Sequence, residues 1–234
     1  MKKILIANRG EIAIRIARTC NDLGIKTVGI YSEDDSSSLH LSKMDESFVI
    51  DEKGANAYLD IKKIISIAKL SKVDAIHPGY GFLSENPSFA SAAKRAKIKF
   101  IGPSERALKT FGEKTEAKDL AERLSIPVIK GSKGKVTLRQ AVAFMKELKK
   151  SSSLVIKAVA GGGGRGMRVV SSPTELKEAM DRASSEAQAA FNSPELYVEE
   201  YLKNYRHVEV QVLGDGKGQA THFHERECSV QRRY

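Results

Sequence analysis

The sequence has few cysteines: only Cys20 and Cys228 occur among its 234 residues, and they stand far apart. They form no CxxC pair, so their spacing indicates no redox motif. Two isolated thiols are compatible with a reducing compartment, and we expect both to be inert. This favours a cytoplasmic protein.

Long hydrophobic runs are also absent. No stretch of eighteen apolar residues occurs, so the sequence predicts no membrane-spanning helix and no membrane partner. The first apolar stretch, residues 4–7, is followed at once by Asn8, Arg9 and Glu11. We therefore expect neither a secretory signal nor a transit leader at this end of the chain.

Aromatic residues make up only 6% of the sequence, although its formal net charge is +10. Such a charge is typical of proteins that bind nucleic acid, an anionic surface or phosphorylated ligands. The cationic residues are spread widely, and they are not interleaved with the aromatic platform that single-strand binders use. We expect a solvated basic surface and no nucleic-acid partner. The hydrophobic content of 41% is enough for a packed core.

Strands and helices are expected to alternate in the first hundred residues. The expected strands are 3–7, 27–31, 48–50, 74–77 and 99–101, and the expected helices are 12–23, 61–70 and 87–96. This order predicts a doubly wound, Rossmann-like parallel sheet, in which ligands lie beyond the carboxyl ends of the strands. The loops after Ala7 and His77 leave from that edge. The acidic and serine-rich stretch 34–38 is typical of an ordinary loop.

The pattern changes after two connecting helices expected within residues 104–130. Helices are then expected at 138–149 and 175–191, and strands at 154–159, 167–170, 195–199, 207–213 and 219–224. The last two strands are joined by a glycine-rich turn, which predicts antiparallel pairing. The second half is therefore expected to be α+β, with a domain boundary near Gly112.

A glycine run is the strongest local motif in the sequence. Lys157 ends an expected strand, and four consecutive glycines follow at 161–164. Such a loop can turn its backbone N–H groups toward a phosphate, and the lysine adds a positive charge. The lysine precedes the glycines, unlike a Walker A motif, and the loop leads into a strand, unlike a Rossmann fingerprint. By itself the pattern fits a phosphate site or a plain hairpin turn.

Three further segments carry weaker signals. Residues 199–202 could present backbone groups to a flat base edge, or could be an ordinary strand end. Residues 207–212 place His207 on the polar face of an expected half-exposed strand, where a lone histidine is more often structural than catalytic. The polar, glycine-rich segment 77–86 lies at the expected ligand edge, but a structured turn would have the same composition.

Taken together, these segments resemble the biotin carboxylases. The matching motifs are IANRGEIA at 6–13, HPGYGFLSEN at 77–86, FIGP at 100–103, GEK at 112–114, KAVAGGGGRGMR at 157–168, RHVEVQV at 206–212 and ERECSVQRR at 225–233. They follow the order of the family and cover essentially the whole chain. The resemblance implies an α/β fold, in which residues 1–112 form the doubly wound, pre-ATP-grasp amino-terminal domain. Residues 113–234 would form the first, incomplete part of an α+β ATP-grasp domain, with a lid subdomain at about 131–203.

The resemblance also implies a reaction. Bicarbonate attacks MgATP to give carboxyphosphate, whose CO2 carboxylates biotin on a carrier protein or domain. A carboxyltransferase then uses the carboxybiotin, in acetyl-CoA carboxylase for fatty acid biosynthesis or in a related carboxylase. The implied ATP-binding residues are Lys114, Lys157, Gly163, Gly164, Glu199, Glu200, Tyr201, Leu202, His207, Gln231 and Tyr234. Tyr80 and Gly81 would line the biotin and bicarbonate pocket, and Arg15 and Arg18 would lie at a homodimer interface.

The chain departs from the family pattern in places. Val159-Ala160 replaces the usual Ser-Gly before the glycine flap, Glu200 stands where lysine is common, and Tyr234 stands where His or Asn is common. The family's metal-binding glutamates and its bicarbonate-binding and catalytic residues are expected beyond residue 234. We therefore expect no metal ligands and no complete catalytic set in residues 1–234, and no activity for these residues alone. Residues 195–224 are expected to form a partial sheet with exposed apolar surface.

Two other interpretations stay open. The chain could be a truncated paralogue that binds nucleotide without turnover. It could also belong to another ATP-grasp ligase, such as a carbamoyl-phosphate synthase, although the motifs at 6–13 and 77–86 argue against that.

Overall fold

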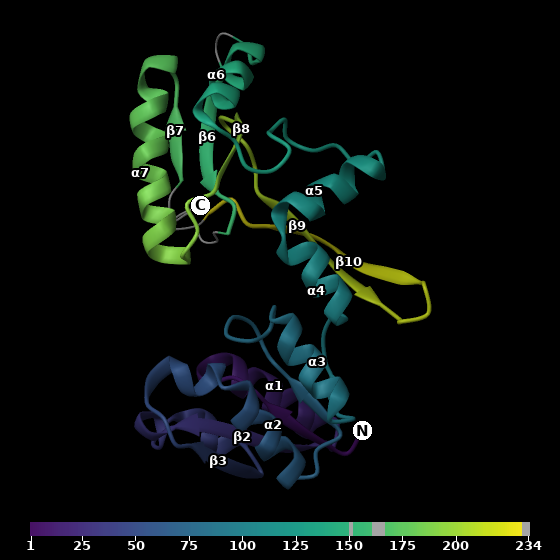
Figure 1. The fold of residues 1–234 in the computed structure, drawn as a ribbon. Coiled ribbons are helices and arrows are strands. Elements are labelled where there is room, and N and C mark those ends of the chain that lie inside the picture. Colours follow the sequence, from purple (N-terminus) through teal and green to yellow (C-terminus); the bar gives the residue numbers. More distant parts are fainter. Residues whose placement is uncertain (150–151, 161–166, 231–234) are drawn as a thin grey trace. The chain divides into compact units, whose positions relative to one another are not determined.

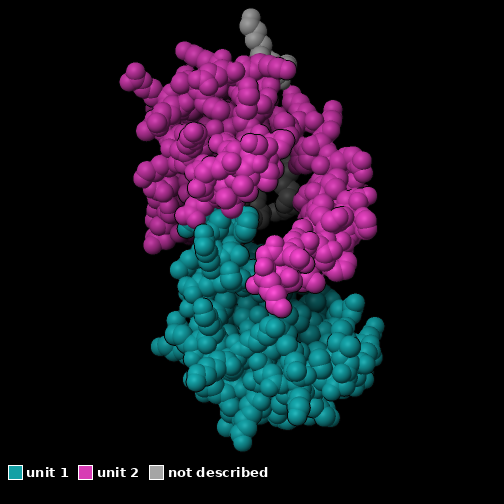
Figure 2. All heavy atoms as spheres, turned by 90° about the vertical axis from the view of Figure 1, so that its right-hand side faces the viewer, with its two compact units in different colours: residues 1–113 teal, residues 114–234 magenta. Residues whose placement is uncertain are grey.

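The computed structural model describes residues 1–149, 152–160 and 167–230 (Figure 1). The chain divides into two compact units, residues 1–113 and residues 114–234 (Figure 2). Each unit has its own hydrophobic core. In the described ranges, no helix combines the length and the apolarity that crossing a bilayer requires.

Unit 1 is built on a parallel sheet of five strands in the order β3-β2-β1-β4-β5. The strands are β1 (Lys3–Ile6), β2 (Lys26–Ser32), β3 (Glu46–Ile50), β4 (Ala75–His77) and β5 (Lys99–Phe100). The helices are α1 (Gly10–Asp22), α2 (Ile61–Leu70), α3 (Pro87–Arg95) and α4 (Glu105–Gly112), with 3-10 helices η1 (Glu33–Asp35), η2 (Leu39–Lys43) and η3 (Gly54–Leu59). The strand order reverses between β1 and β4, where doubly wound sheets open a crevice at the carboxyl ends of their strands.

Strand β1 supplies side chains to both faces of this sheet. Leu5 belongs to a core that includes Tyr58 and Ile64, whereas Ile4 and Ile6 pack with the apolar face of α1. The alternation follows from the two-residue period of a strand, because both faces of a parallel sheet are covered. Burial of each such aliphatic side chain stabilises the fold by about 1.5–3 kcal/mol.

Helix α3 begins directly after the segment 77–86. The side-chain oxygen of Asn86 accepts a hydrogen bond from the Phe89 N–H at 3.1 Å, and Pro87 occupies the first turn. Both features favour a helix start, because they satisfy or avoid an unpaired N–H group. The end of the segment 77–86 is therefore fixed to the core of unit 1.

Unit 2 contains two separate antiparallel sheets, β7-β6-β8 and β10-β9. Its strands are β6 (Ser153–Ala158), β7 (Arg168–Val170), β8 (Leu196–Tyr201), β9 (Val208–Gly214) and β10 (Ala220–Glu227). Its helices are α5 (Lys114–Arg123), α6 (Leu138–Glu147) and α7 (Pro173–Phe191). Helices α6 and α7 pack on the three-stranded sheet around Leu154, Ile156 and Leu176. The predicted fold class, a parallel doubly wound sheet followed by an α+β part, is confirmed.

Three details of unit 2 differ from expectation. Strand β8 continues past Glu199 to Tyr201, because β6 pairs with it as far as Tyr201 and the Glu200 N–H donates to the carbonyl of Lys130 at 2.9 Å on the other edge. Strand β8 pairs with β6 and not with β9, so residues 195–224 do not form one partial sheet. Strand β9 is not half-buried, since Val210 and Val212 are each 55% exposed. The expected exposed apolar surface is present on this hairpin.

Candidate functional site

Unit 2 contains a cavity of about 410 Å³ beside the edge of the three-stranded sheet. Its lining residues come from the segment before α6, from β6 and β8, and from the segment leading into β9: Ile129, Val155, Lys157, Met167, Glu199, Glu200, Tyr201, Leu202, Tyr205, Arg206 and His207. Six of the residues proposed from sequence for nucleotide binding therefore lie around one cavity. The lining combines apolar surface with a few charged groups, as small-molecule sites do.

Glu199 lies between two lysines at this cavity. Its carboxylate contacts the Lys157 ammonium group at 2.7 Å and that of Lys118 at 3.3 Å, and its side chain is only 13% exposed. Lys157 reaches Glu199 diagonally across the sheet, because Val155 is the direct partner of Glu199 in the β6–β8 register. The arrangement leaves one net positive charge close to the cavity, which suits an anionic ligand.

Lys118 was not among the residues proposed from sequence. Lys118 lies on α5. Gly131 packs against the ion pair of Lys118 and Glu199: a Cβ at Gly131 would lie 2.5 Å from the Lys118 ammonium nitrogen and 2.8 Å from Cγ of Glu199. Lys118 is 81 residues away from Glu199 in the sequence, so no local pattern relates them. Gly131 is required because the backbone approaches β8 too closely for a side chain.

The segment 199–202 is held mainly through its backbone. Glu199 bridges to Gly131 and Glu200 donates to Lys130, so this part of β8 is paired on both edges. The Glu200 carboxylate accepts a hydrogen bond from the Ser152 hydroxyl at 2.8 Å. Leu202 follows the strand and is 42% exposed beside the cavity, where its side chain can cover a flat ring.

His207 lies at the other side of the lining. Its Nε2 is 3.3 Å from the Glu209 carboxylate, and its backbone N–H donates to the Ser229 hydroxyl at 2.7 Å. Both contacts tie His207 to the β9–β10 hairpin and the segment that follows it. Of the remaining nucleotide-binding proposals, Gly163, Gly164, Gln231, Tyr234 and the side chain of Lys114 lie outside the described residues.

In unit 1, the crevice between β1 and β4 is filled by Asn8. This side chain is only 3% exposed, and its amide donates to the carbonyls of Pro78 at 2.7 Å and Tyr80 at 2.8 Å. Gly79 has a φ of +65°, and a Cβ there would lie 2.7 Å from the Asn8 amide nitrogen. Asn8 therefore binds the segment 77–86 to the sheet edge, and only glycine fits opposite it.

Tyr80 and Gly81 are the exposed part of this segment. Tyr80 is 60% exposed and its hydroxyl donates to the carboxylate of Glu11, a hydrogen bond that raises the pKa of the phenol. Burial lowers the pKa of His77 at the start of the segment, and its Nδ1 accepts from the Gly79 N–H at 3.0 Å. A neutral His77 and a hydrogen-bonded Tyr80 thus frame the turn at Gly79.

Asp35 accepts four side-chain hydrogen bonds, from Tyr58 at 2.7 Å, Arg9 at 2.8 Å, Ser38 at 3.1 Å and Ser32 at 3.2 Å. Burial alone would raise the pKa of Asp35, but these hydrogen bonds outweigh it and lower the pKa to about 2. The carboxylate is therefore ionised throughout the neutral range.

Acid should weaken unit 1 through Asp35. A folded-state pKa of about 2, below the ordinary value of 3.8, gives a stabilisation that is present above about pH 4 and is lost as the pH falls toward 2. Between these pH values, Asp35→Asn should lose less unfolding free energy than the wild type. The loss that remains is expected from Asp45, whose pKa is also about 2. Urea unfolding at stepped pH measures the slope. The same slope in both proteins would contradict this assignment.

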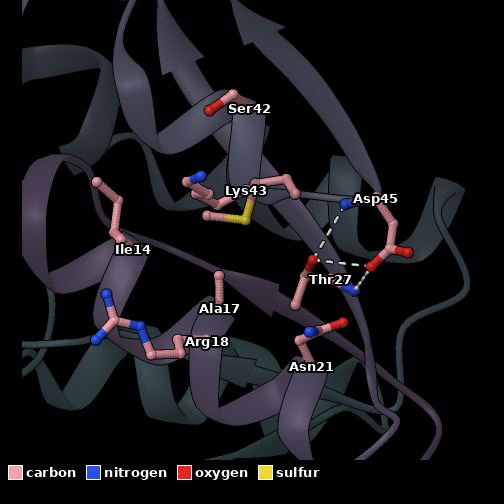
Figure 3. Close-up of a pocket in the computed structure, with 9 residues that line it drawn as sticks. Ile14, Ala17, Arg18, Asn21, Thr27, Ser42, Lys43 and Asp45 are labelled. Atoms are coloured by element: carbon pink, nitrogen blue, oxygen red, sulfur yellow. Dashed lines mark hydrogen bonds between the residues drawn. The ribbon is translucent and has the colours of Figure 1, made fainter.

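The two arginines proposed for a dimer interface lie exposed on α1. Arg15 donates to the Thr19 hydroxyl at 2.9 Å. Arg18 lines a cavity of about 400 Å³ between α1 and η2, where Thr27 and Asp45 hydrogen bond to each other (Figure 3). Among the described residues, no group of three or more His, Cys, Asp or Glu side chains is arranged to hold a metal ion.

Comparisons with known proteins cover both units. Residues 1–108 match the family model "Biotin carboxylase, N-terminal domain", and residues 113–234 match "Carbamoyl-phosphate synthase L chain, ATP binding domain". The chain is 52% identical to pyruvate carboxylase of Bacillus subtilis (strain 168) over 236 residues, which is all of this chain and 20% of that protein. It is 45% identical to biotin carboxylase 1 of the same organism over 235 residues, all of this chain and 52% of that protein.

A solved structure agrees with these matches. The biotin carboxylase domain dimer of the Hydrogenobacter thermophilus 2-oxoglutarate carboxylase, in complex with MgADP, ADP and bicarbonate, matches 99% of this chain and 51% of its own. The TM-score is 0.93 and the sequence identity is 41%. The chain thus spans between a fifth and about half of the length of these relatives.

Proposed function

The chain belongs to the biotin carboxylase family, and from that premise we propose that it supplies nucleotide- and biotin-binding residues to an ATP- and bicarbonate-dependent biotin carboxylase. The observation that carries the proposal is the cavity in unit 2, where Lys157, Glu199 to Leu202 and His207 meet. The ligands of the Hydrogenobacter thermophilus domain support the same substrates. Residues 1–112 would be the amino-terminal domain and residues 113–234 the first part of the ATP-grasp domain, with the lid at about 131–203.

We propose that Lys157 neutralises ATP phosphates. Phosphoryl transfer depends on positioning and on charge stabilisation, so a lysine at the end of a strand suits the task. Lys157 is paired with Glu199 in this structure, and Lys118 contacts the other carboxylate oxygen. Lys157 can therefore turn to a phosphate while Glu199 keeps a cationic partner. Lys114 and the flap residues Gly163 and Gly164 complete the phosphate site in this proposal.

The adenine and ribose would lie along the other side of the cavity. Glu199, Glu200, Tyr201 and Leu202 would hold the base, through backbone groups at the strand end and the apolar side chain of Leu202. His207, with Gln231 and Tyr234, would lie by the ribose. The pairing of β8 on both edges supports this role, because a rigid strand holds a base edge in one position.

Further parts of the proposal rest on the resemblance. Tyr80 and Gly81 would line the biotin and bicarbonate pocket, and Arg15 and Arg18 would contact a second copy in a homodimer. Magnesium would act with ATP, with its ligands beyond residue 234. A biotin carrier protein or domain and a carboxyltransferase would be partners in the cytoplasm. The final acceptor is acetyl-CoA, as in fatty acid biosynthesis, or another acyl-CoA or keto acid such as pyruvate.

Two alternatives compete with this proposal. A nucleotide-binding paralogue without turnover would keep the same cavity. Another ATP-grasp ligase would share the ATP-binding domain of unit 2, but the match of residues 1–108 to the biotin carboxylase amino-terminal domain favours the carboxylase.

An assay of ATP hydrolysis separates these possibilities. We expect the complete gene product that contains residues 1–234 to release phosphate from MgATP only with bicarbonate present, and faster with free biotin. The polypeptide of residues 1–234 alone should show no such turnover. ATP binding without turnover by the complete product would support the paralogue, and bicarbonate-dependent turnover by residues 1–234 alone would refute their inactivity.

A further inference from the structure

The backbone of the segment 77–86 is unusually constrained. Gly79 and Gly81 each have a φ of +65°, and Phe82 has a φ of +42° although it carries a side chain. A residue with a Cβ is strained in a left-handed conformation, so the surrounding structure must hold Phe82 in place. Such a residue points to packing that fixes the turn carrying Tyr80 and Gly81.

Aromatic stacking holds the side chain of Phe82. Its ring stacks on the Tyr58 ring, with centroids 5.1 Å apart and an angle of 25° between the planes. The Arg9 guanidinium lies over both rings, 5.4 Å from the Tyr58 centroid and 5.9 Å from that of Phe82. Stacking and cation–π contacts are both attractive, so together they can offset the backbone strain at Phe82.

Asp35 fixes the other two members of this cluster. One oxygen of its carboxylate accepts from both the Tyr58 hydroxyl and the Arg9 guanidinium. Tyr58 is fully buried, so its ring has no freedom to follow Phe82 if the turn moves. The carboxylate therefore sets the positions of the two groups that Phe82 packs against.

We propose that Arg9, Asp35 and Tyr58 form a brace that holds Phe82 in its left-handed conformation and thereby positions Tyr80 and Gly81. Its catalytic consequence rests on the function proposed above, in which Tyr80 and Gly81 line the biotin pocket. The brace residues do not touch substrate in this proposal; they act through the turn. Asn8 holds the opposite side of the same turn through Pro78 and Tyr80.

The test compares two variants with a matched control in the complete gene product. Asp35→Asn removes the charge from the brace, Tyr58→Phe removes one hydroxyl and keeps the ring, and Asp51→Asn changes an exposed carboxylate of the same unit. We expect Asp35→Asn to raise the KM for free biotin about tenfold, which corresponds to about 1.4 kcal/mol. Tyr58→Phe should raise it less, and the KM for MgATP should stay within about twofold in all three, a difference that falls below 1 kcal/mol.

Hydrogen exchange tests the brace independently of activity. The amides of Gly79 and Ser84 are hydrogen bonded within the segment, to His77 Nδ1 and the Gly81 carbonyl. They should exchange faster in Asp35→Asn and Tyr58→Phe while the amides of β1 keep their protection. If both amides exchange at the wild-type rate in the two variants, the proposal of a brace is refuted. Faster exchange with an unchanged biotin KM overturns its catalytic role, and an inactive wild type with faster exchange in the variants rejects the proposed function alone.

Discussion

Lys157→Met in the complete gene product should lower kcat/KM for MgATP by about 100- to 1000-fold, the range seen when one preorganised charge stabiliser is removed from a reaction site. Methionine keeps the length and much of the apolar stem of the side chain, so the loss is one of charge. The variant would remove the ammonium group at the end of β6 that is proposed to neutralise the phosphates. Glu199 would then keep only Lys118 as a cationic partner. Steady-state phosphate release against MgATP concentration gives the parameters.

Lys135→Met is the matched control for this experiment. Lys135 also contacts a glutamate at 2.7 Å, but that pair with Glu195 is exposed, the lysine side chain by 72% and the glutamate by 41%. Exposed pairs contribute about 0–1 kcal/mol, so its activity should stay within about twofold of the wild type. Equal activities of Lys157→Met and the wild type would refute the proposed role of Lys157 in the phosphate site.

Gly79→Ala should destabilise unit 1 by about 2–4 kcal/mol, which is large beside the 5–15 kcal/mol that keeps a typical domain folded. A residue with a Cβ is strained at a φ of +65°, and the added carbon would lie 2.7 Å from the buried Asn8 amide. Asn8 cannot move aside without giving up its hydrogen bonds to Pro78 and Tyr80. Urea unfolding, monitored through hydrogen exchange of the β1 amides, measures the loss of unfolding free energy in unit 1 specifically.

Gly54→Ala separates backbone strain from the steric clash. Gly54 has a φ of +67°, but a Cβ there meets no atom within 4 Å. In this variant the free energy of unfolding should fall only by the cost of a left-handed alanine, about 1–2 kcal/mol. If Gly79→Ala and Gly54→Ala lose the same unfolding free energy, the contact with Asn8 does not limit which residue fits at position 79.

The sequence predicted the regular elements well where apolar periodicity was strong. Helix α2 matches the predicted range 61–70, because its isoleucines repeat at helical spacing and Asp60 caps its start. The structure continues β8 two residues past its predicted end, since Glu200 pairs with Lys130 and Leu154 and Tyr201 pairs with Ser153, all of them tertiary contacts. Local patterns carry no information about such partners.

The same limit applies to the sites. Six of the candidate residues line the cavity of unit 2. Lys118 is not among the candidates, because only the folded chain brings α5 to Glu199. The composition of the stretch 34–38 is typical of an ordinary loop, yet Asp35 within it accepts hydrogen bonds from Arg9 and Tyr58. A short acidic segment acquires its importance from residues that reach it across the fold, which composition cannot reveal.

The buried Asn8 has a consequence for ligand binding at the carboxyl edge of the sheet in unit 1. A sheet wound like that of unit 1 offers its crevice to nucleotides in many proteins, and a protein with a net charge of +10 attracts them. Here the crevice is already filled by a side chain of the same unit, bonded to two carbonyls. The position that such a sheet leaves open to a ligand is occupied in unit 1 by the chain itself, and Asn8 there fixes the turn at Tyr80 to the sheet edge.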